Sequence, residues 1–224
     1  MNRETFRRIE GYMQSCMQDC AHDQEHVYRV LYNAMDIARN ENVDWDVLIA
    51  AALLHDISRP EQLADSRVDH ASHGAEKAYA FLMEQGFAAD FCDHVWQCIR
   101  THRFRKTEQP ATIEAKILFD ADKLDVAGAI GIARTLEYNG ETGRPIYNRD
   151  EHGEISDGAK DVSDSFFREY KFKLEHICDH FLTERGQELA RARHAAAIAY
   201  YEALLREVRD PSGRAVLAQI LTDA

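Results

Sequence analysis

Apolar residues recur with a helical period along almost the whole chain. The pattern predicts amphipathic helices over residues 3–19 and 23–41, because apolar positions three and four residues apart fall on one face of a helix. Residues 44–56 differ, since they are apolar on nearly every side, and Asp44 suits the N-cap position. A helix that is apolar all round belongs in an interior, so we expect this third helix at the centre of the fold.

The remaining chain continues the same pattern. Helices are predicted over residues 70–85, 88–102, 112–140, about 160–184 and 187–208. Gly128 and Gly131 mark a place for a kink in the long helix, and glycines between 139 and 159 predict a long irregular loop. No segment reads convincingly as a strand. The sequence therefore predicts an all-α fold, with one domain over residues 1–224 and the C-terminal helices 160–208 completing a helical bundle.

The composition indicates which binding partners and which cellular compartment to expect. Lys and Arg number 27 against 39 Asp and Glu, a net charge of −12, which argues against duplex nucleic acid as a partner. No apolar run approaches the length of a membrane span, so no membrane partner is expected. The N-terminus lacks the apolar region of a signal peptide, and the 5 cysteines form no CxxC pair. We expect a cytoplasmic protein with reduced thiols.

Four polar side chains occupy positions that should be apolar. His26 shares a helix face with Val30, His55 and Asp56 end the central helix, and Asp122 lies within the long helix. Burying two imidazoles and two carboxylates together is costly, and a divalent cation compensates that cost. Mixed nitrogen and oxygen ligands suit Mn²⁺, Fe²⁺, Ni²⁺, Co²⁺ or Zn²⁺, with Mg²⁺ also open.

An early histidine, an HD dipeptide that closes an apolar helix, and an aspartate within DADKLD resemble the HD superfamily of metal-dependent phosphohydrolases. The matching residues are His26, His55, Asp56 and Asp122, in a metal-binding core of about residues 20–140. ASHGAEKA, CIRTHRFRK and AKILFDADKLDVAGAIGIAR further resemble a bacterial subgroup of small HD hydrolases, which is similar to nucleotide pyrophosphohydrolases.

The resemblance implies a small nucleotide as substrate. The expected reaction is the hydrolysis of a nucleoside triphosphate to monophosphate and pyrophosphate, by attack of a metal-bound hydroxide, with Asp56 required for catalysis as well as for the metal. Phosphodiesterase or phosphomonoesterase activity of the same fold is an alternative. A di-iron oxygenase and a non-catalytic metal-containing signalling module are the others.

His73 and His102 lie between the HD pair and the last aspartate. Some HD enzymes are similar in carrying two extra histidines there, which bind a second metal. The two side chains could instead bind a substrate phosphate, act as general acid, or make ordinary helix-end hydrogen bonds. His70 starts a helix, and we expect it to be exposed.

Basic residues lie beside these positions. In HD proteins a cation at the place of Lys123 often contacts phosphate, and a salt bridge to a ligand carboxylate is the other interpretation. Arg103, with Arg105 and Lys106, could steer phosphate or simply form a solvated surface. Asp125 is one helical turn beyond Asp122 and could orient a ligand.

Aromatic residues gather on the late helices. They are Phe166, Phe167, Tyr170, Tyr200 and Tyr201. Their apolar faces either complete the core or form the interface of a homodimer.

Overall fold

The computed structural model describes residues 1–17, 21–103, 108–209 and 212–222, and for residues 21–23, 212, 214 and 215 it describes the backbone alone. Within these ranges every regular element is a helix, and the one β-type contact is an isolated bridge between Arg149 and Ile155. The all-α prediction is confirmed. None of these helices is long and apolar enough to cross a bilayer.

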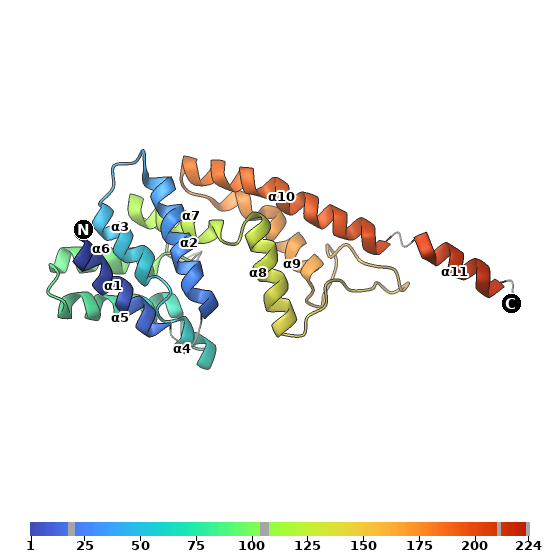
Figure 1. Ribbon diagram of the computed structural model, residues 1–224, viewed down its shortest axis with the longest axis horizontal. Helices are drawn as coiled ribbons and strands as arrows, with labels where there is room; N and C mark the ends of the chain where they lie inside the picture. Colours follow the sequence, from blue (N-terminus) through green and yellow to red (C-terminus); the bar gives the residue numbers. More distant parts are fainter. Residues whose placement is uncertain (18–20, 104–107, 210–211, 223–224) are drawn as a thin grey trace. The chain divides into compact units, whose positions relative to one another are not determined.

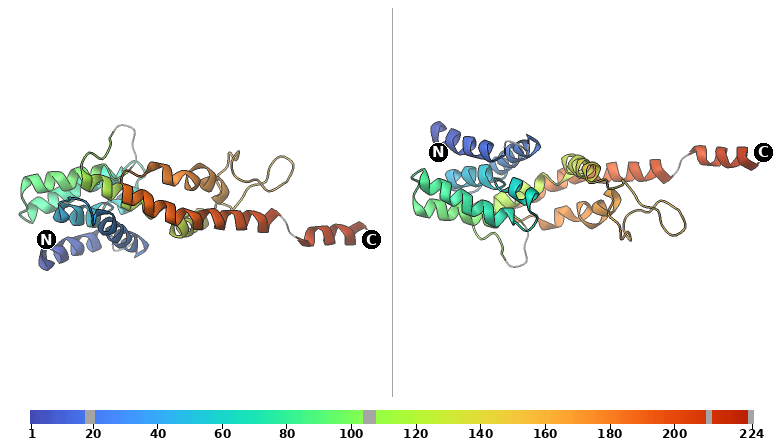
Figure 2. Two further views of the ribbon diagram at one scale, coloured as in Figure 1. Left: turned by 90° about the horizontal axis from the view of Figure 1, so that it is seen from above. Right: turned by 90° about the horizontal axis from the view of Figure 1, so that it is seen from below.

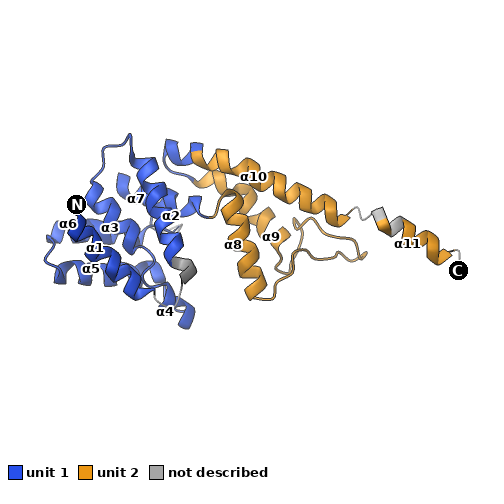
Figure 3. Ribbon diagram, viewed as in Figure 1, with its two compact units in different colours: residues 1–125, 181–188 blue, residues 126–180, 189–224 orange. Residues whose placement is uncertain are grey.

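The chain forms two compact units, coloured separately in Figure 3. Unit 1 comprises residues 1–125 and 181–188, and unit 2 comprises residues 126–180 and 189–224. The helices of unit 1 are α1 (Arg3–Cys16), α2 (Ala21–Ala38), α3 (Trp45–Leu54), α4 (Arg59–Ala64), α5 (His70–Glu84), α6 (Ala89–Arg100), α7 (Ile113–Leu124) and the start of α10 (Glu184–Arg209). Those of unit 2 are α8 (Gly128–Glu141), α9 (Phe166–Phe172), the 3-10 helix η1 (Leu174–His180), the rest of α10 and α11 (Ser212–Thr222). The HD-type domain predicted over residues 1–224 stays a prediction.

The apolar helix α3 lies at the centre of unit 1, as the sequence predicts. It contacts α1, α2, α5, α6 and α7, which surround it (Figure 1, Figure 2). Its last two residues, Leu53 and Leu54, are fully buried. Burying one leucine side chain contributes about 1.5–3 kcal/mol to stability. The Asp44 side chain accepts hydrogen bonds from the backbone N–H groups of Asp46 and Val47 and so fixes where α3 begins.

Helix α4 was not expected, because its segment contains Pro60 and reads as a loop. Pro60 lies in the first turn of α4, where the missing N–H costs no intrahelical hydrogen bond. The result is a short helix, Arg59–Ala64, that begins three residues after Asp56 of the buried HD dipeptide.

The helix predicted over residues 112–140 is two helices, α7 and α8. Gly128 adopts a φ of +66°, and a Cβ atom there would lie 2.7 Å from the Cβ of Arg193. At Gly131 a Cβ would approach the carbonyl oxygen of Val126 to 2.2 Å. The two glycines therefore permit a complete break rather than the kink that the pattern suggested.

Asp120 of α7 joins a distant part of the chain to this helix. Its buried carboxylate accepts hydrogen bonds from the backbone N–H groups of Leu182 and Thr183, at 2.7–3.1 Å, and from the Thr183 hydroxyl at 2.6 Å. These are the residues that lead into α10, so Asp120 satisfies donors at the start of that helix.

Unit 2 has its own apolar core. It contains Ile132, Ile155, Phe166, Phe167, Tyr170, Leu174, Ala197 and Tyr201. Four of the five aromatic residues of the late helices thus complete a core, whereas Tyr200 remains 43% exposed. The helix predicted over 160–184 starts later and divides at Lys173 into α9 and η1, with Ser165 capping α9.

Candidate metal centre

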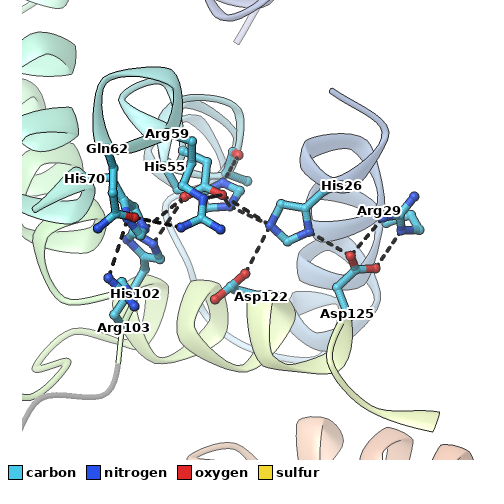
Figure 4. Close-up of polar contacts among 12 residues, drawn as sticks. His26, Arg29, His55, Arg59, Gln62, His70, His102, Arg103, Asp122 and Asp125 are labelled. Carbon is cyan, nitrogen blue, oxygen red and sulfur yellow. Dashed lines mark hydrogen bonds and ion pairs between the residues drawn. The ribbon is translucent and has the colours of Figure 1, made fainter. Parts of the chain in front are cut away.

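The end of α3 carries two polar side chains into the interior of unit 1. The helix ends at Leu54, and His55 and Asp56 follow with exposed fractions of 0% and 6%. His26 reaches the same place from α2, and Asp122 reaches it from α7 (Figure 4). The structure therefore brings together all four residues that the sequence predicts as metal ligands.

His26 connects the members of this first group. Its Nε2 lies 3.2 Å from Asp122 Oδ1, 3.5 Å from Asp56 Oδ2 and 3.3 Å from His55 Nε2. Candidate ligand atoms of His26, His55 and Asp56 all lie within 4.8 Å of one another. We call His26, His55, Asp56 and Asp122 the first ligand group.

Asp56 belongs to a second group as well. Its Oδ1 lies 3.3 Å from His70 Nε2 and 3.6 Å from His102 Nε2, and both imidazoles are buried. Oδ1 itself is buried and has no hydrogen-bond partner in the described residues. A buried carboxylate oxygen without a donor is costly, so its surroundings fit a bound cation. We call Asp56, His70 and His102 the second ligand group.

Two of the four histidines are oriented by the backbone. Nδ1 of His55 donates to the carbonyl oxygen of Ala52 at 2.8 Å, and Nδ1 of His102 donates to that of Ile99 at 2.6 Å. A carbonyl oxygen can only accept, so Nδ1 carries a proton in both rings. In the neutral ring Nε2 then holds the lone pair, and this is the nitrogen that faces Asp56.

Side chains orient the other two histidines. Nδ1 of His26 lies 2.7 Å from Asp125 Oδ2, and Asp125 also accepts two hydrogen bonds from the guanidinium of Arg29. Nδ1 of His70 lies 2.6 Å from Oε1 of Gln62. All four rings thus present Nε2 to the interior. Metal-binding histidines typically have this arrangement, in which the second ring nitrogen donates to an acceptor behind it.

The charges in the cluster shift the pKa values in opposite directions. Burial by itself would lower the pKa of His26, but hydrogen bonds with Asp122 and Asp125 outweigh burial and raise it well above its ordinary value. Burial lowers the pKa of His70 to about 3. For Asp56, burial would raise the pKa, but the neighbouring imidazoles, His55 first, hold it well below its ordinary range. Without a cation, a proton on His26 offsets part of the carboxylate charge.

Both the sequence and the fold match known proteins. The model of the HD domain family matches residues 24–127. A predicted HD superfamily hydrolase from an uncultured Thermotogales bacterium is 30% identical, with a TM-score of 0.62 over 90% of this chain and 91% of that chain. The chain belongs to the HD superfamily.

Two further relatives with solved structures cover nearly all of the chain. An HD-superfamily hydrolase from Bacillus thuringiensis is 26% identical, with a TM-score of 0.71 over 92% of this chain and 97% of that chain. Bacillus subtilis YpgQ, whose structure was determined in complex with ADP, is 28% identical, with a TM-score of 0.70 over 93% of this chain and 96% of that chain. The protein is an HD-type metal-dependent hydrolase, and its His/Asp cluster is able to hold a divalent cation.

His73 and Lys123 are two further residues predicted for the HD site. The side chain of His73 is exposed on α5, and the structure does not bring it to the cluster. Lys123 Nζ lies 4.5 Å from the centre of the Phe119 ring. The proposed contact of Lys123 with phosphate stays a prediction.

Arg103 lies beside the second ligand group, with Nη1 3.5 Å from Nδ1 of His70 (Figure 4). Its side chain is 41% exposed and lies 4.0 Å from Asp69 Oδ1. Arg105 and Lys106, named with it in the sequence, fall outside the described residues.

Three residues of the HD site were missed from the sequence. His70 was expected to be exposed, and that prediction is wrong, since it is 3% exposed and faces Asp56. Gln62 and Arg59 lie on the unexpected helix α4, and Nε of Arg59 is 3.7 Å from Asp56 Oδ2. No sequence signal marked Gln62, whereas Arg59, three residues after Asp56, would face the same way on a continuing helix.

Proposed function

We propose that this protein hydrolyses a nucleoside triphosphate to the monophosphate and pyrophosphate. The observation that carries the proposal is the convergence of two ligand groups on one buried carboxylate, Asp56. The choice of a nucleotide is supported by the structure of YpgQ with ADP, and the choice of the bond by the resemblance to nucleotide pyrophosphohydrolases.

The first ligand group would hold the cation, with Mn²⁺ as one candidate. The donor set fits, because Asp122 Oδ1, Asp56 Oδ2 and His55 Nε2 all lie within 3.5 Å of His26 Nε2. When bound, a divalent cation lowers the pKa of a water ligand and polarises a phosphoryl oxygen.

His102 is the residue positioned to move a proton. Because Nδ1 of His102 donates to the carbonyl oxygen of Ile99, the lone pair of Nε2 faces the space beside Asp56. This nitrogen can take the proton of an attacking water. If a second cation binds to Asp56, His70 and His102, the same lone pair becomes a ligand instead, and the ratio of metal to protein separates the two cases.

Arg59 and Arg103 would bind the phosphate chain. Their side chains are 34% and 41% exposed, and both lie beside the second ligand group, at Asp56 and His70 respectively. A guanidinium can donate two parallel hydrogen bonds to phosphate oxygens, which neutralises charge that develops on the transferred group. The substrate phosphates are therefore proposed to lie on the His70 side of Asp56.

The test combines metal analysis with a substrate screen. Purified protein is analysed for bound metal and then assayed with Mn²⁺ against nucleoside triphosphates, nucleoside monophosphates and phosphodiesters, with pyrophosphate and orthophosphate measured separately. We expect pyrophosphate and a monophosphate in equal amounts. Orthophosphate as the sole phosphate product of the triphosphates would contradict the proposed bond. Release of orthophosphate from the monophosphates would favour a phosphomonoesterase.

Two further results would point to the alternatives. Iron content with O₂-dependent turnover would favour a di-iron oxygenase. Tight metal binding without turnover of any of these substrates would favour a signalling module.

A further inference from the structure

We propose that Gln62 is a positioning residue that fixes the tautomer of His70, so that the lone pair of His70 Nε2 faces Asp56. The inference rests on the proposed metal-dependent function, because it concerns whether His70 is available to a cation. Gln62 is half-buried on α4, and its side-chain amide contacts three groups at once. Two of them, on Arg59 and His70, are labelled with it in Figure 4.

The contacts determine which way the amide of Gln62 points. Arg59 Nη1 lies 2.8 Å from Oε1, and a guanidinium can only donate, so this atom must be the amide oxygen. On the other side Nε2 lies 3.1 Å from the carbonyl oxygen of Val68, which can only accept. The two neighbours therefore independently require the same orientation.

The orientation of Gln62 in turn determines the proton on His70. Nδ1 of His70 lies 2.6 Å from the same Oε1, and two acceptors cannot approach that closely without a proton between them. Nδ1 is therefore the protonated nitrogen, and Nε2 of the neutral ring holds the lone pair. This nitrogen, Nε2, lies 3.3 Å from Asp56 Oδ1, an oxygen without a hydrogen-bond partner in the described part of the chain.

The opposite tautomer has its partners in place. With the proton on Nε2, His70 could donate to Asp56 Oδ1, and Nδ1 could accept from Arg103 Nη1, which is 3.5 Å away. That arrangement satisfies both groups internally and removes a nitrogen and an oxygen from metal binding. Gln62 opposes it through the 2.6 Å contact, which is shorter and stronger than the contact with Arg103.

The test uses Gln62→Leu, which keeps the approximate volume but removes the acceptor, and Gln62→Glu, which keeps an acceptor. Ring ¹⁵N spectra of the metal-free proteins, at a pH where the ring is neutral, report which nitrogen of His70 is protonated, with a His70→Gln sample to assign the signal. Gln62→Leu should move the proton to Nε2 and weaken Mn²⁺ binding by calorimetry about 10–100-fold. Gln62→Glu should keep the proton on Nδ1 and rescue most of the affinity, measured at a pH where the ring is neutral.

Gln97→Leu provides the matched control, since Gln97 is exposed on α6, and it should change neither measurement. A folded Gln62→Leu protein with wild-type tautomer and Mn²⁺ affinity would overturn the proposal. If that variant fails to fold, Gln62→Glu provides the test, because a spectrum that shows the proton on Nε2 of His70 would also overturn the proposal. A wild-type protein that hydrolyses no nucleotide would defeat the proposed function but leave both of these measurements intact.

Discussion

Two histidines on either side of Asp56 are each oriented by another side chain, in one case by a carboxylate and in the other by an amide. In the first ligand group the carboxylate of Asp125 orients His26, and in the second the amide of Gln62 orients His70. The contact distances are similar, 2.7 and 2.6 Å, and both hold Nδ1. Yet the pKa of His26 is raised well above its ordinary value, whereas that of His70 is lowered to about 3.

The comparison teaches that the charges around each ring decide what the ring does without metal. Hydrogen bonds with the carboxylates of Asp122 and Asp125 stabilise a protonated imidazole at His26, so this ring carries a proton that a cation must displace. A neutral amide gives no such stabilisation, and burial keeps His70 neutral and ready to coordinate. Tautomer and charge are thus controlled separately within one cluster.

Removal of the shared residue should have the largest effect. Asp56→Ala deletes a ligand of both groups, so we expect no measurable Mn²⁺ binding and no turnover. Thermal unfolding provides a second measurement: the wild-type protein should gain about 2.7 kcal/mol at a Mn²⁺ concentration 100-fold above its dissociation constant, and the variant should gain nothing. Asp93→Ala, at an exposed position on α6, serves as the control. Metal-dependent stabilisation of Asp56→Ala would refute the assignment of the centre.

A change confined to the second group should separate chemistry from metal binding. His102→Gln removes the proposed proton acceptor but leaves His26, His55, Asp56 and Asp122 unchanged. We expect kcat to fall about 10²–10⁴-fold while one Mn²⁺ still binds with nearly wild-type affinity. Loss of one metal per protein, measured by elemental analysis, would instead identify His102 as a ligand of a second cation.

A change confined to the first group should act on affinity. Asp125→Asn removes the charge behind His26 and weakens its pairing with Arg29, and we expect Mn²⁺ affinity to fall about 10–100-fold. Asp36→Asn is the matched control, because Asp36 also pairs with an arginine, Arg185, at 3.1 Å but outside the cluster. Equal losses of Mn²⁺ affinity in both variants would indicate a general electrostatic effect.

The smallest expected effect directly tests the difference between the pKa values of His26 and His70. Below the raised pKa of His26, binding of Mn²⁺ should release about one proton per protein, and none of it should come from His70. The apparent affinity should therefore rise about tenfold for each unit of increasing pH in this range. Calorimetry in buffers of different ionisation enthalpy measures the released proton. A pH-independent affinity would contradict the raised pKa of His26.

The same proton affects the stability of the metal-free protein. Because the folded-state pKa of His26 is raised, its contribution to the free energy of unfolding is fully present below the unfolded value of about 6.5 and is lost as the pH rises through the folded value.

The sequence predicts the first ligand group well because His26 and Asp122 lie within helices, and His55 and Asp56 directly follow the apolar helix α3. The second ligand group is harder to predict from the sequence, because it depends on whether His70 or His73 of α5 faces inward. Buried Ala71, Gly74 and Ala78 place His70, four residues before Gly74, on the inner side, whereas His73 shares the outer side with exposed Glu76. That signal is present in the sequence, and the resemblance alone did not distinguish the two.

Other features could not be read from the pattern. The apolar period continues through the end of α7 into α8, so it gives no sign of the break that the left-handed Gly128 permits. Gln62 is a polar residue in a segment that reads as a loop, and its importance depends on three spatial neighbours.

The anchoring of Thr183 by Asp120 has an evolutionary consequence. Residues 126–180 depart from the end of α7, and the chain returns to a carboxylate on that same helix. Such an excursion, with entry and exit on a single helix, can lengthen, shrink or be exchanged between lineages while the turn that bears Asp122 keeps its path.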